Sequence, residues 1–437
     1  MEPTGTTQPD FKRKPSLVSL MLVAGEASGD RHGAALARAL KQLYPETKFE
    51  LFGSGGDEMR AAGVETLIDA REVAIIGVPE IARAFGRLYR AYRTLLRAAR
   101  SRSPSAIVLI DWPDFNMRLA RKLHREGFKI VYYVSPQVWA WRKYRVRALR
   151  RDVDRMLVIL PFEEEFYKKI GIKAKYVGHP LVDKLVATVS RDEFCRAHGL
   201  DSTRPILALL PGSRHKEIHY HVPIMLETAL RLRNADFGLR PEDSASDLPQ
   251  PQSSQISNLK SEISSPLSAI HNPQFVIPLA STVRREQVEP AIQQAQIASK
   301  ELSVRVIEND THNALIYSDF AVVASGTATV EAALAGTPMV IIYRGSEVNW
   351  RLIRPLIQLD TFGMVNLIAG RRIVPELMQR DATGERIARE VSAILSDRDR
   401  LTQMCKELGL VRELLRAGGG SGAERAARAV MEVIKAF

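Results

Sequence analysis

The chain has 437 residues, 45% of them hydrophobic, so it is long enough for two domains that each bury a core. Its formal net charge of +12 indicates an acidic partner, which could be nucleic acid, anionic lipid or a phosphorylated substrate. The two cysteines, Cys195 and Cys405, lack the spacing of a disulfide framework or a zinc site, and they favour a reducing cytoplasm.

The first part of the chain predicts a tail followed by an α/β domain. Residues 1–15 are polar and then basic, without the apolar core of a signal peptide, and no later run approaches the roughly 18 apolar residues of a membrane span. We therefore expect a disordered tail over 1–15. Short apolar runs then alternate with helical patterns, which predicts a first domain over 16–184 with a parallel sheet covered by helices. Its expected strands are 17–23, 106–110, 130–134 and 156–160.

The turn after the first strand carries two acidic residues, Glu26 and Asp30. An acidic turn between a strand and a helix suits a hydroxyl-rich sugar or a catalytic base better than it suits a phosphate. Glu26 is therefore a candidate catalytic residue. Asp30 and Ser28 are at least as well explained as caps of the following helix.

Residues 81–100 predict a basic amphipathic helix, with arginines on one face and apolar side chains on the other. The apolar face is expected to pack on the sheet. The arginine face, beside the apolar loop 73–78, suits an anionic membrane surface, and a solvated charged face is the alternative. The arginines of this face are Arg83, Arg87, Arg90, Arg93, Arg97 and Arg100.

The apolar strand 106–110 runs directly into Asp111, which is the first candidate for general base. Ligands of open α/β sheets bind at the carboxyl ends of the strands, and a carboxylate held there can take a proton from an attacking hydroxyl. Pro113 stiffens the loop. Asp114 and Asn116 are expected to cap the following helix or to fix the loop.

The strand 130–134 precedes a loop that is dense in aromatic and polar residues. Trp139 and Trp141 suit stacking on a sugar face or an acyl chain, and burial in the core is the alternative. Further along, His179 suits contact with a ligand phosphate, and a hydrogen-bonded hinge histidine explains it equally well.

The alternation of strands and helices restarts in the second half and predicts a second domain over 185–400. A stretch rich in proline, serine and glutamine interrupts it at 241–273, where we expect a disordered surface insertion. Residues 401–437 are helical in pattern, and we expect these helices to cross back to the first domain or to pack on a partner subunit of a homodimer. The expected strands are 206–210, 275–279, 304–307, 320–324 and 339–343.

The predicted fold class is thus α/β, with two doubly wound Rossmann-like domains that face a central cleft and a helical C terminus. Within the second domain, the strand 206–210 leads into Gly212, Ser213 and Arg214, and a helical pattern resumes from about 222 to 233. Arg214 is placed just past the carboxyl end of a strand, and its forked guanidinium suits phosphate oxygens. We expect this turn to bind substrate.

A second turn of this kind follows the strand 320–324. Ser325, Gly326 and Thr327 offer small side chains and free N–H groups at the opening of a helix, which suits a diphosphate. Glu331, one turn into the helix, is placed to accept hydrogen bonds from a sugar diol. A capped structural helix packed by its alanines is the alternative. The sequence lacks a P-loop, and no predicted strand is followed by GxGxxG. The motifs typical of ATP hydrolysis and of dinucleotide redox chemistry are therefore missing.

Eight motifs recur in order over nearly the whole chain: AGEASGD (24–30), DWPDFN (111–116), YYVSPQVWAWR (132–142), LPFE (160–163), GHPL (178–181), LLPGSR (209–214), ASGTATVEAALAGTPMVIIYR (324–344) and NLIAGRRIVPEL (366–377). Together they resemble the lipid-A-disaccharide synthase family, which are inverting glycosyltransferases of the GT-B type. Three features depart from the family pattern: the tail, the insertion, and Trp112 where a small residue is expected.

The resemblance implies transfer of 2,3-diacylglucosamine from its UDP derivative to 2,3-diacylglucosamine 1-phosphate (lipid X), giving the β-1,6-linked lipid A disaccharide 1-phosphate and UDP. It implies no metal and no other cofactor, and it adds Asn366 to the expected substrate-binding residues. The first domain would face the acceptor and the membrane, and the second would bind the UDP-sugar. We therefore expect a cytoplasmic enzyme associated peripherally with the cytoplasmic face of the inner membrane.

Two other functions stay open at this point. One is another UDP-sugar enzyme of the same fold, such as the lipid II-forming transferase or a UDP-N-acetylglucosamine epimerase, against which DWPDFN and SPQVWAWR count. The other is a basic nucleic-acid-binding protein, which no recognisable binding module supports. We expect no nucleic-acid partner.

Overall fold

The computed structural model describes residues 17–73, 81–139, 143–182, 185–233, 272–280, 282–300, 302–347, 350–351, 354, 361–416 and 418–435. For residues 72–73, 81–85 and 143 it describes the backbone alone. The expected tail lies outside these ranges, and so does the expected insertion except for its last two residues.

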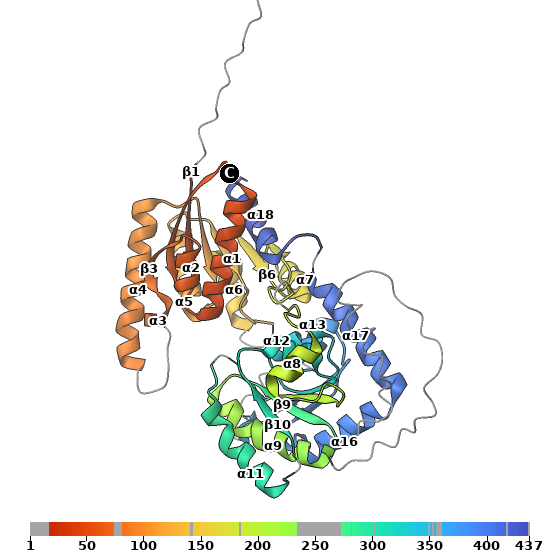
Figure 1. The fold of residues 1–437 in the computed structure, drawn as a ribbon. Helices are drawn as coiled ribbons and strands as arrows, with labels where there is room; N and C mark the ends of the chain where they lie inside the picture. The colour runs from red at the N-terminus through yellow and green to blue at the C-terminus, as the bar shows by residue number, and fades with distance from the viewer. Residues whose placement is uncertain are drawn as a thin grey trace, which may run out of the picture. The chain divides into compact units, whose positions relative to one another are not determined.

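The chain forms two compact units, each built around one parallel sheet (Figure 1). The first unit comprises Met1–Pro180 and Arg416–Phe437, and the second comprises Leu181–Leu415. The chain therefore passes between the units twice. The segment 401–437, for which a crossing is predicted, is divided: residues up to Leu415 cluster with the second unit, and those from Arg416 cluster with the first.

The sheet of the first unit has the strand order β3-β2-β1-β4-β5-β6-β7, and all its neighbouring strands pair in parallel. The order reverses between β1 and β4, which makes the carboxyl ends of these two strands the topological switch point where such sheets bind ligands. The strands are β1 (Leu17–Val23), β2 (Lys48–Gly55), β3 (Glu65–Asp69), β4 (Ala106–Ile110), β5 (Ile130–Tyr133), β6 (Arg155–Val158) and β7 (Ala174–Tyr176).

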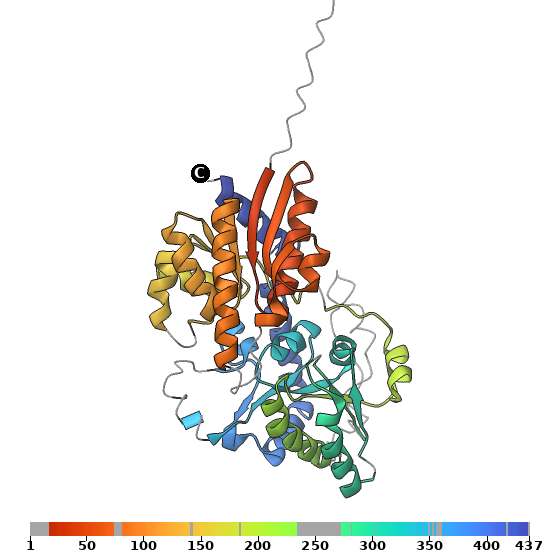
Figure 2. The ribbon, with the colours of Figure 1, turned by 90° about the vertical axis from the view of Figure 1, so that its left-hand side faces the viewer.

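Helices cover both faces of this sheet because alternate residues of each central strand point to opposite sides. Leu20 and Leu22 of β1 belong to a buried cluster with residues of α1, α2 and α18, whereas Met21 and Val23 belong to one with residues of α4, α5, α6 and α7. Figure 2 shows α1 and α4 on opposite sides of the strands. The helices of the unit are α1 (Ala27–Leu43), α2 (Asp57–Ala61), α3 (Ala70–Val73), α4 (Ile81–Arg102), α5 (Pro113–Arg125), α6 (Val146–Asp152), α7 (Pro161–Lys169) and α18 (Gly422–Lys435).

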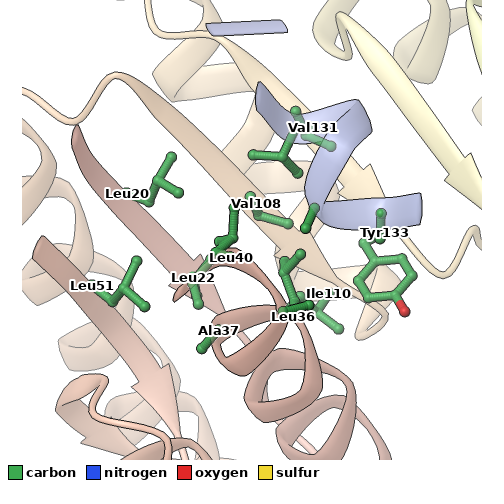
Figure 3. Packing of buried hydrophobic residues seen from close by; sticks show 14 of the residues in the cluster. Leu20, Leu22, Leu36, Ala37, Leu40, Leu51, Val108, Ile110, Val131 and Tyr133 are labelled. Atoms are coloured by element: carbon green, nitrogen blue, oxygen red, sulfur yellow. The ribbon is translucent and has the colours of Figure 1, made fainter. Parts of the chain in front are cut away.

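The last helix, α18, completes the core of the first unit. Ala426, Ala427 and Val430 are fully buried, and their small side chains let the helix lie close to the strands. Figure 3 shows Leu36 and Leu40 of α1 beside the apolar side chains of the neighbouring strands, with α18 passing over the sheet next to them. Removing α18 would expose this apolar surface to water.

The second sheet repeats this topology with the order β10-β9-β8-β11-β12-β13, again all parallel. Its switch point lies between β8 and β11. The strands are β8 (Ile206–Leu210), β9 (Gln274–Pro278), β10 (Val304–Ile307), β11 (Phe320–Ala324), β12 (Met339–Tyr343) and β13 (Glu376–Met378). The helices are α8 (Arg191–His198), α9 (His215–Arg233), α11 (Glu289–Ala298), α12 (Thr311–Tyr317), α13 (Ala328–Ala335), α15 (Met364–Ala369), α16 (Gly384–Leu395) and α17 (Arg398–Arg416).

The prediction of two doubly wound sheets with a helical C terminus is confirmed. One boundary differs clearly: α9 begins at His215, where the sequence pattern indicated a start near residue 222. Pro223 lies inside this helix and hid its first two turns, since proline normally marks a helix boundary. The earlier start brings the helix N terminus directly against Arg214.

Candidate active site

Asp111 follows the last residue of β4, at the switch point of the first sheet. Its backbone is left-handed, with φ of 49°, and that of Trp112 is left-handed too, with φ of 51°. Such conformations cost on the order of 1–3 kcal/mol for residues other than glycine, and they persist only where the surroundings enforce them. The chain therefore turns sharply at this point, and the turn is held in place.

Three hydrogen bonds enforce the turn at Asp111. Its backbone N–H donates to the carbonyl of Tyr133 (2.9 Å). Its carbonyl accepts from the Tyr132 hydroxyl and from Asn116 Nδ2, each at 2.8 Å. Tyr132 and Asn116 are both fully buried. Asn116 thus fixes the loop, as predicted, and β5 helps to hold the candidate base on β4.

The carboxyl group of Asp111 has an unusual proton affinity. Burial disfavours its charged form, and the nearby Glu26 carboxylate acts in the same direction, so together they raise the pKa of Asp111 to about 6. The backbone N–H of Trp112 opposes this shift by hydrogen-bonding the carboxylate. A carboxylate with a pKa near neutrality is a stronger base than a free aspartate and is still ionised at neutral pH.

The two acids of the turn after β1 differ in role. Glu26 is exposed at the N-cap position of α1 and makes no side-chain capping bond. Asp30 is buried and accepts hydrogen bonds from the backbone N–H groups of Gly56 (2.6 Å), Glu58 (3.1 Å) and Met59 (3.1 Å). Asp30 therefore caps α2, a segment distant in sequence, and does not cap its own helix. The Glu26 carboxylate is the one whose charge raises the pKa of Asp111.

Trp112 joins the turns that carry Glu26 and Asp111. Its indole stacks on Phe115, with ring centroids 3.9 Å apart and planes at 10°. It also covers Gly25 so closely that a Cβ at that position would lie 2.2 Å from an indole carbon. A side chain at residue 25 would collide with the indole, so Gly25 is required for the packing of Trp112.

Trp139 is buried, and its indole N–H donates to the Glu163 carboxylate (2.9 Å). The alternative of a core tryptophan therefore holds for Trp139, and Trp141 lies outside the described residues. His179 is also buried, and its burial together with the nearby His32 lowers its pKa to about 4. It is neutral at physiological pH.

In the second unit, the turn of Gly212, Ser213 and Arg214 follows β8. The Glu217 carboxylate accepts from the backbone N–H groups of Ser213 (2.9 Å) and Arg214 (3.2 Å) and from the Arg214 guanidinium (3.0 Å). The Arg214 side chain is 82% exposed. Gly212 has φ of 110°, and a Cβ there would lie 2.3 Å from a Glu217 oxygen. A phosphate at this turn would compete with Glu217 for its donors, and Arg214 is the group best placed to reach outward.

The second predicted turn lies at the neighbouring strand end, after β11. Gly326 has φ of 154°, and a Cβ at this position would meet no atom within 4 Å, so the turn is open there. The Ser325 hydroxyl donates to the carbonyl of Phe362 (3.0 Å), and Thr327 is exposed at the N-cap of α13. Glu331 lies half-buried in the first turn of α13. The turns after β8 and β11 therefore lie together at the switch point of this sheet.

Asn366 is buried, and protein groups fill its hydrogen-bonding capacity. Its Nδ2 donates to the carbonyl of Val374 (2.9 Å) and to Glu376 Oε1 (2.8 Å), while its Oδ1 accepts from the N–H groups of Ile373 (2.8 Å) and Val374 (3.0 Å). Glu376 also accepts from the N–H groups of Phe362 and Gly363. The Asn366 side chain thus holds the loop that the Ser325 hydroxyl contacts.

His221, which the sequence did not single out, ties two strand ends together. Its Nδ1 lies 2.7 Å from the carbonyl of Pro211, and its Nε2 accepts from the N–H of Arg344 (3.0 Å). Nδ1 therefore carries the proton, and burial lowers the pKa of the ring, which keeps it neutral. The sequence offers no signal that separates His221 from the neighbouring His219.

On α4, the arginine face is exposed where the structure describes it. Arg87, Arg90, Arg93 and Arg97 are exposed, while Leu95 is buried against the sheet. Arg100 is exposed and forms a bidentate pair with Glu126. The Arg83 side chain and loop residues 74–78 lie outside the description.

Within the described ranges, no group of three or more histidine, cysteine, aspartate or glutamate side chains is arranged to hold a metal ion. No helix in those ranges has both the length and the apolar composition that crossing a bilayer requires.

Comparison with known proteins gives the family. A family model described as lipid-A-disaccharide synthetase matches residues 20–241 and 252–430. The chain belongs to the lipid-A-disaccharide synthase family. The lipid-A-disaccharide synthase of Koribacter versatilis is 40% identical over 420 residues, covering 95% of this chain and 99% of that protein. That of Geobacter metallireducens is 40% identical over 415 residues, covering 95% and 97%.

Solved structures agree on the fold. The UDP-N-acetylglucosamine 2-epimerase of Neisseria meningitidis, bound to UDP-GlcNAc, has a TM-score of 0.52 at 11% identity and covers 97% of this chain and 100% of its own. The calicheamicin glycosyltransferase CalG4 has a TM-score of 0.55 at 13% identity and covers 97% and 99%. These likenesses show the GT-B fold alone. Family membership makes the chain a UDP-sugar-dependent glycosyltransferase of lipid A biosynthesis, and it favours that function over an epimerase, a lipid II-forming transferase or a nucleic-acid-binding protein.

Proposed function

We propose that Asp111 is the general base of lipid A disaccharide formation by this member of the lipid-A-disaccharide synthase family. Asp111 takes the proton from the 6-hydroxyl of 2,3-diacylglucosamine 1-phosphate. The oxygen attacks the anomeric carbon of UDP-2,3-diacylglucosamine from the side opposite UDP. A β-1,6 glycosidic bond forms, the bond from the anomeric carbon to the diphosphate oxygen breaks, and UDP leaves with that electron pair.

The observation that carries this proposal is the Asp111 carboxyl group itself. It lies at the switch point of the first sheet, its backbone is clamped by Tyr132, Tyr133 and Asn116, and its pKa is raised to about 6. A base has to be fixed in place and ionised at the working pH. The hydrogen bonds fix the position of the Asp111 backbone, and a pKa of about 6 leaves the carboxylate ionised at neutral pH. Glu26, whose charge raises the pKa of Asp111, acts in support of this base.

The second unit supplies the binding of the leaving group. The Arg214 guanidinium and the turn of Ser325, Gly326 and Thr327 stabilise the negative charge that grows on the diphosphate, and Glu331 accepts hydrogen bonds from the ribose hydroxyls. Gly212 and Ser213 shape the turn that presents Arg214. Asn366 acts through the loop it holds, since its own amide is occupied. In this proposal Arg214 and the turn hold the diphosphate without a metal ion.

The enzyme reaches its acylated acceptor as a peripheral protein at the cytoplasmic face of the inner membrane. The exposed arginines of α4, namely Arg87, Arg90, Arg93 and Arg97, support this proposal, because basic side chains bind anionic lipid surfaces. We also propose a homodimer, which analytical ultracentrifugation would detect as twice the mass of the chain.

The test is a reconstitution with purified protein. Incubation with UDP-2,3-diacylglucosamine and 2,3-diacylglucosamine 1-phosphate should release UDP and yield the disaccharide 1-phosphate, with an anomeric configuration at the new bond opposite to that of the donor. Release of UDP without disaccharide, or retention of configuration, would contradict the proposed reaction.

A further inference from the structure

Glu163 is a buried acid that the proposed mechanism does not use. It lies in the first turn of α7 and is 1% exposed. Its Oε1 accepts hydrogen bonds from Ser135 Oγ (2.7 Å) and from the Trp139 indole N–H (2.9 Å), while its Oε2 accepts from the backbone N–H of Leu160 (3.1 Å). Both carboxylate oxygens are therefore engaged, and two of the three donors belong to the loop after β5.

The loop after β5, residues 134–139, is held by α7 at several points. Besides the two bonds to Glu163, the Tyr167 hydroxyl, one turn further along α7, donates to the carbonyl of Pro136 (2.8 Å). The Trp139 ring packs edge to face on Phe162, with centroids 4.9 Å apart. One short helix thus determines the conformation of most of this loop.

This loop lies beside the proposed base. It leaves the carboxyl end of β5, and β5 is hydrogen-bonded next to β4, whose carboxyl end carries Asp111. The last two residues of β5, Tyr132 and Tyr133, are those that clamp the Asp111 backbone. Because parallel strands end at the same edge of a sheet, the loop and Asp111 occupy neighbouring positions there.

Only one side chain of the loop points to solvent. Of the six loop residues, all of them described, Ser135, Pro136, Val138 and Trp139 are buried, Val134 is half-buried, and Gln137 is exposed. An amide both donates and accepts hydrogen bonds, which suits the hydroxyl and acylamide groups of an acylated amino sugar.

The network around Glu163 is a costly way to hold a loop. Burial raises the pKa of Glu163 to about 7 despite its three donors, which shows that the charged form is destabilised. Well-packed apolar side chains generally stabilise a core as well as buried charges do. Directed hydrogen bonds impose one geometry, which apolar packing does less strictly.

We propose that Glu163 is a positioning residue for the acceptor: through Ser135 and Trp139 it fixes the loop 134–139 so that Gln137 hydrogen-bonds the acceptor sugar beside Asp111. Gln137 is then the residue that contacts substrate, and Glu163 acts through it. This inference rests on the proposed function, since it assigns the first unit to the acceptor.

The test separates acceptor binding from donor binding and from folding. Gln137→Ala should raise KM for the diacylglucosamine 1-phosphate by about 5-fold, the usual effect of one lost hydrogen bond. It should leave KM for the UDP-sugar and the melting temperature unchanged.

Glu163→Ala should raise the acceptor KM by about 10-fold or more, because two donors lose their partner. Glu163→Gln, which keeps an acceptor oxygen, should recover most of that loss. The matched control is Glu165→Gln on the exposed side of α7, which should behave as wild type.

If Glu163→Ala does not fold, Trp139→Phe serves in its place. It keeps the aromatic ring against Phe162, removes the indole donor, and should raise the acceptor KM by about 3- to 10-fold. An unchanged acceptor KM in Gln137→Ala, or equal changes in acceptor and donor KM in the Glu163 variants, would overturn the inference. With either of those outcomes the wild-type enzyme would still form the disaccharide. If the proposed function itself were wrong, the wild-type enzyme would form no disaccharide.

Discussion

The two units share one strand topology and differ in the chemistry at their switch points. In the first unit, the ends of β1 and β4 carry Glu26 and Asp111. In the second, the ends of β8 and β11 carry the turns of Arg214 and Ser325. The fold thus presents carboxylates in one unit and, in the other, an arginine and a small-residue turn that we propose to bind the diphosphate. The shared topology determines where a ligand group can be held, while the turn residues decide which chemistry can occur there.

The two sites also differ in how firmly their side chains are held. Asp111 is clamped through its backbone and has a shifted pKa, whereas the Arg214 side chain is 82% exposed and, among the described residues, pairs with Glu217. A base requires a fixed position, and a phosphate-binding arginine can move to its ligand. Substitution of Asp111 should therefore lower turnover, and substitution of Arg214 should weaken UDP binding.

The largest effect is expected at the base. Asp111→Asn should reduce kcat by about 10²- to 10⁴-fold, because the amide cannot take the proton of the 6-hydroxyl. UDP affinity, measured by calorimetry, should not change. The control is Asp114→Asn, because Asp114 is an exposed carboxylate in the first turn of α5, three residues after Asp111, and pairs with Arg145. Near-normal turnover of Asp111→Asn would move the base role to Glu26.

In the second unit, a binding loss is expected without a loss of fold. Arg214→Ala should weaken UDP binding by about 10-fold, since a charged hydrogen bond to the diphosphate is removed. Arg231→Ala is the control, because Arg231 lies on α9, the helix that follows Arg214, and is paired with Glu227. Equal UDP affinities of the two variants would contradict the assignment of this unit to the donor.

Membrane contact gives the third prediction. Replacing Arg87, Arg90 and Arg93 by glutamine should lower the binding constant for anionic vesicles, measured by sedimentation, by up to roughly 100-fold. Each basic group near such a surface contributes about 1 kcal/mol of binding free energy. The salt dependence should weaken as well. A control with the same loss of charge replaces Arg150, Lys168 and Lys169. If both triple variants bind alike, the arginine face of α4 is a solvated surface only.

Stability should respond to Asp111 in the opposite direction from activity. The folded-state pKa of about 6 lies above the ordinary value of 3.8, so the folded protein holds the proton more tightly than the unfolded chain does. The protonated Asp111 carboxyl group therefore adds to the free energy of unfolding below about pH 4. This contribution is lost as the pH rises through about 6. Asp111→Asn should therefore raise the melting temperature by about 2–6 °C at pH 8 and by less at pH 4.5. A variant that melts lower at pH 8 would contradict the burial cost.

Much of the fold could be predicted from the sequence, because the central strands are continuous apolar runs. The strands 106–110, 206–210 and 320–324 match β4, β8 and β11 residue for residue. The missed strands have weaker patterns. β3, β7 and β13 lie at sheet edges and are only partly buried, and β2 begins with polar residues and reaches its buried part at Leu51. Most residues of these three edge strands are half-buried, so the strands lack the continuous apolar run that marks the central ones.

Candidate site residues could be predicted where they follow a strand along the chain. They were missed where their role depends on a hydrogen-bond partner that is distant in sequence. Asp111 and Arg214 stand immediately after predicted strands. The contacts of Glu163 with Ser135, and of His221 with Arg344, join residues far apart in sequence, and no local pattern encodes them. Asn366 entered through the family resemblance alone, and the structure shows its amide bound within the protein.

The central claim is that Asp111 acts as the base, and its most direct test is the pH dependence of kcat/KM for the acceptor. For the wild-type enzyme, log(kcat/KM) should be level above pH 7 and should fall with a slope of one below an apparent pKa of about 6, because the carboxylate must be ionised to accept the proton. In Asp111→Asn, the residual activity should lose this acidic limb. A limb near pH 6 that persists in Asp111→Asn, or a wild-type profile that is flat from pH 5 to 8, would contradict the account.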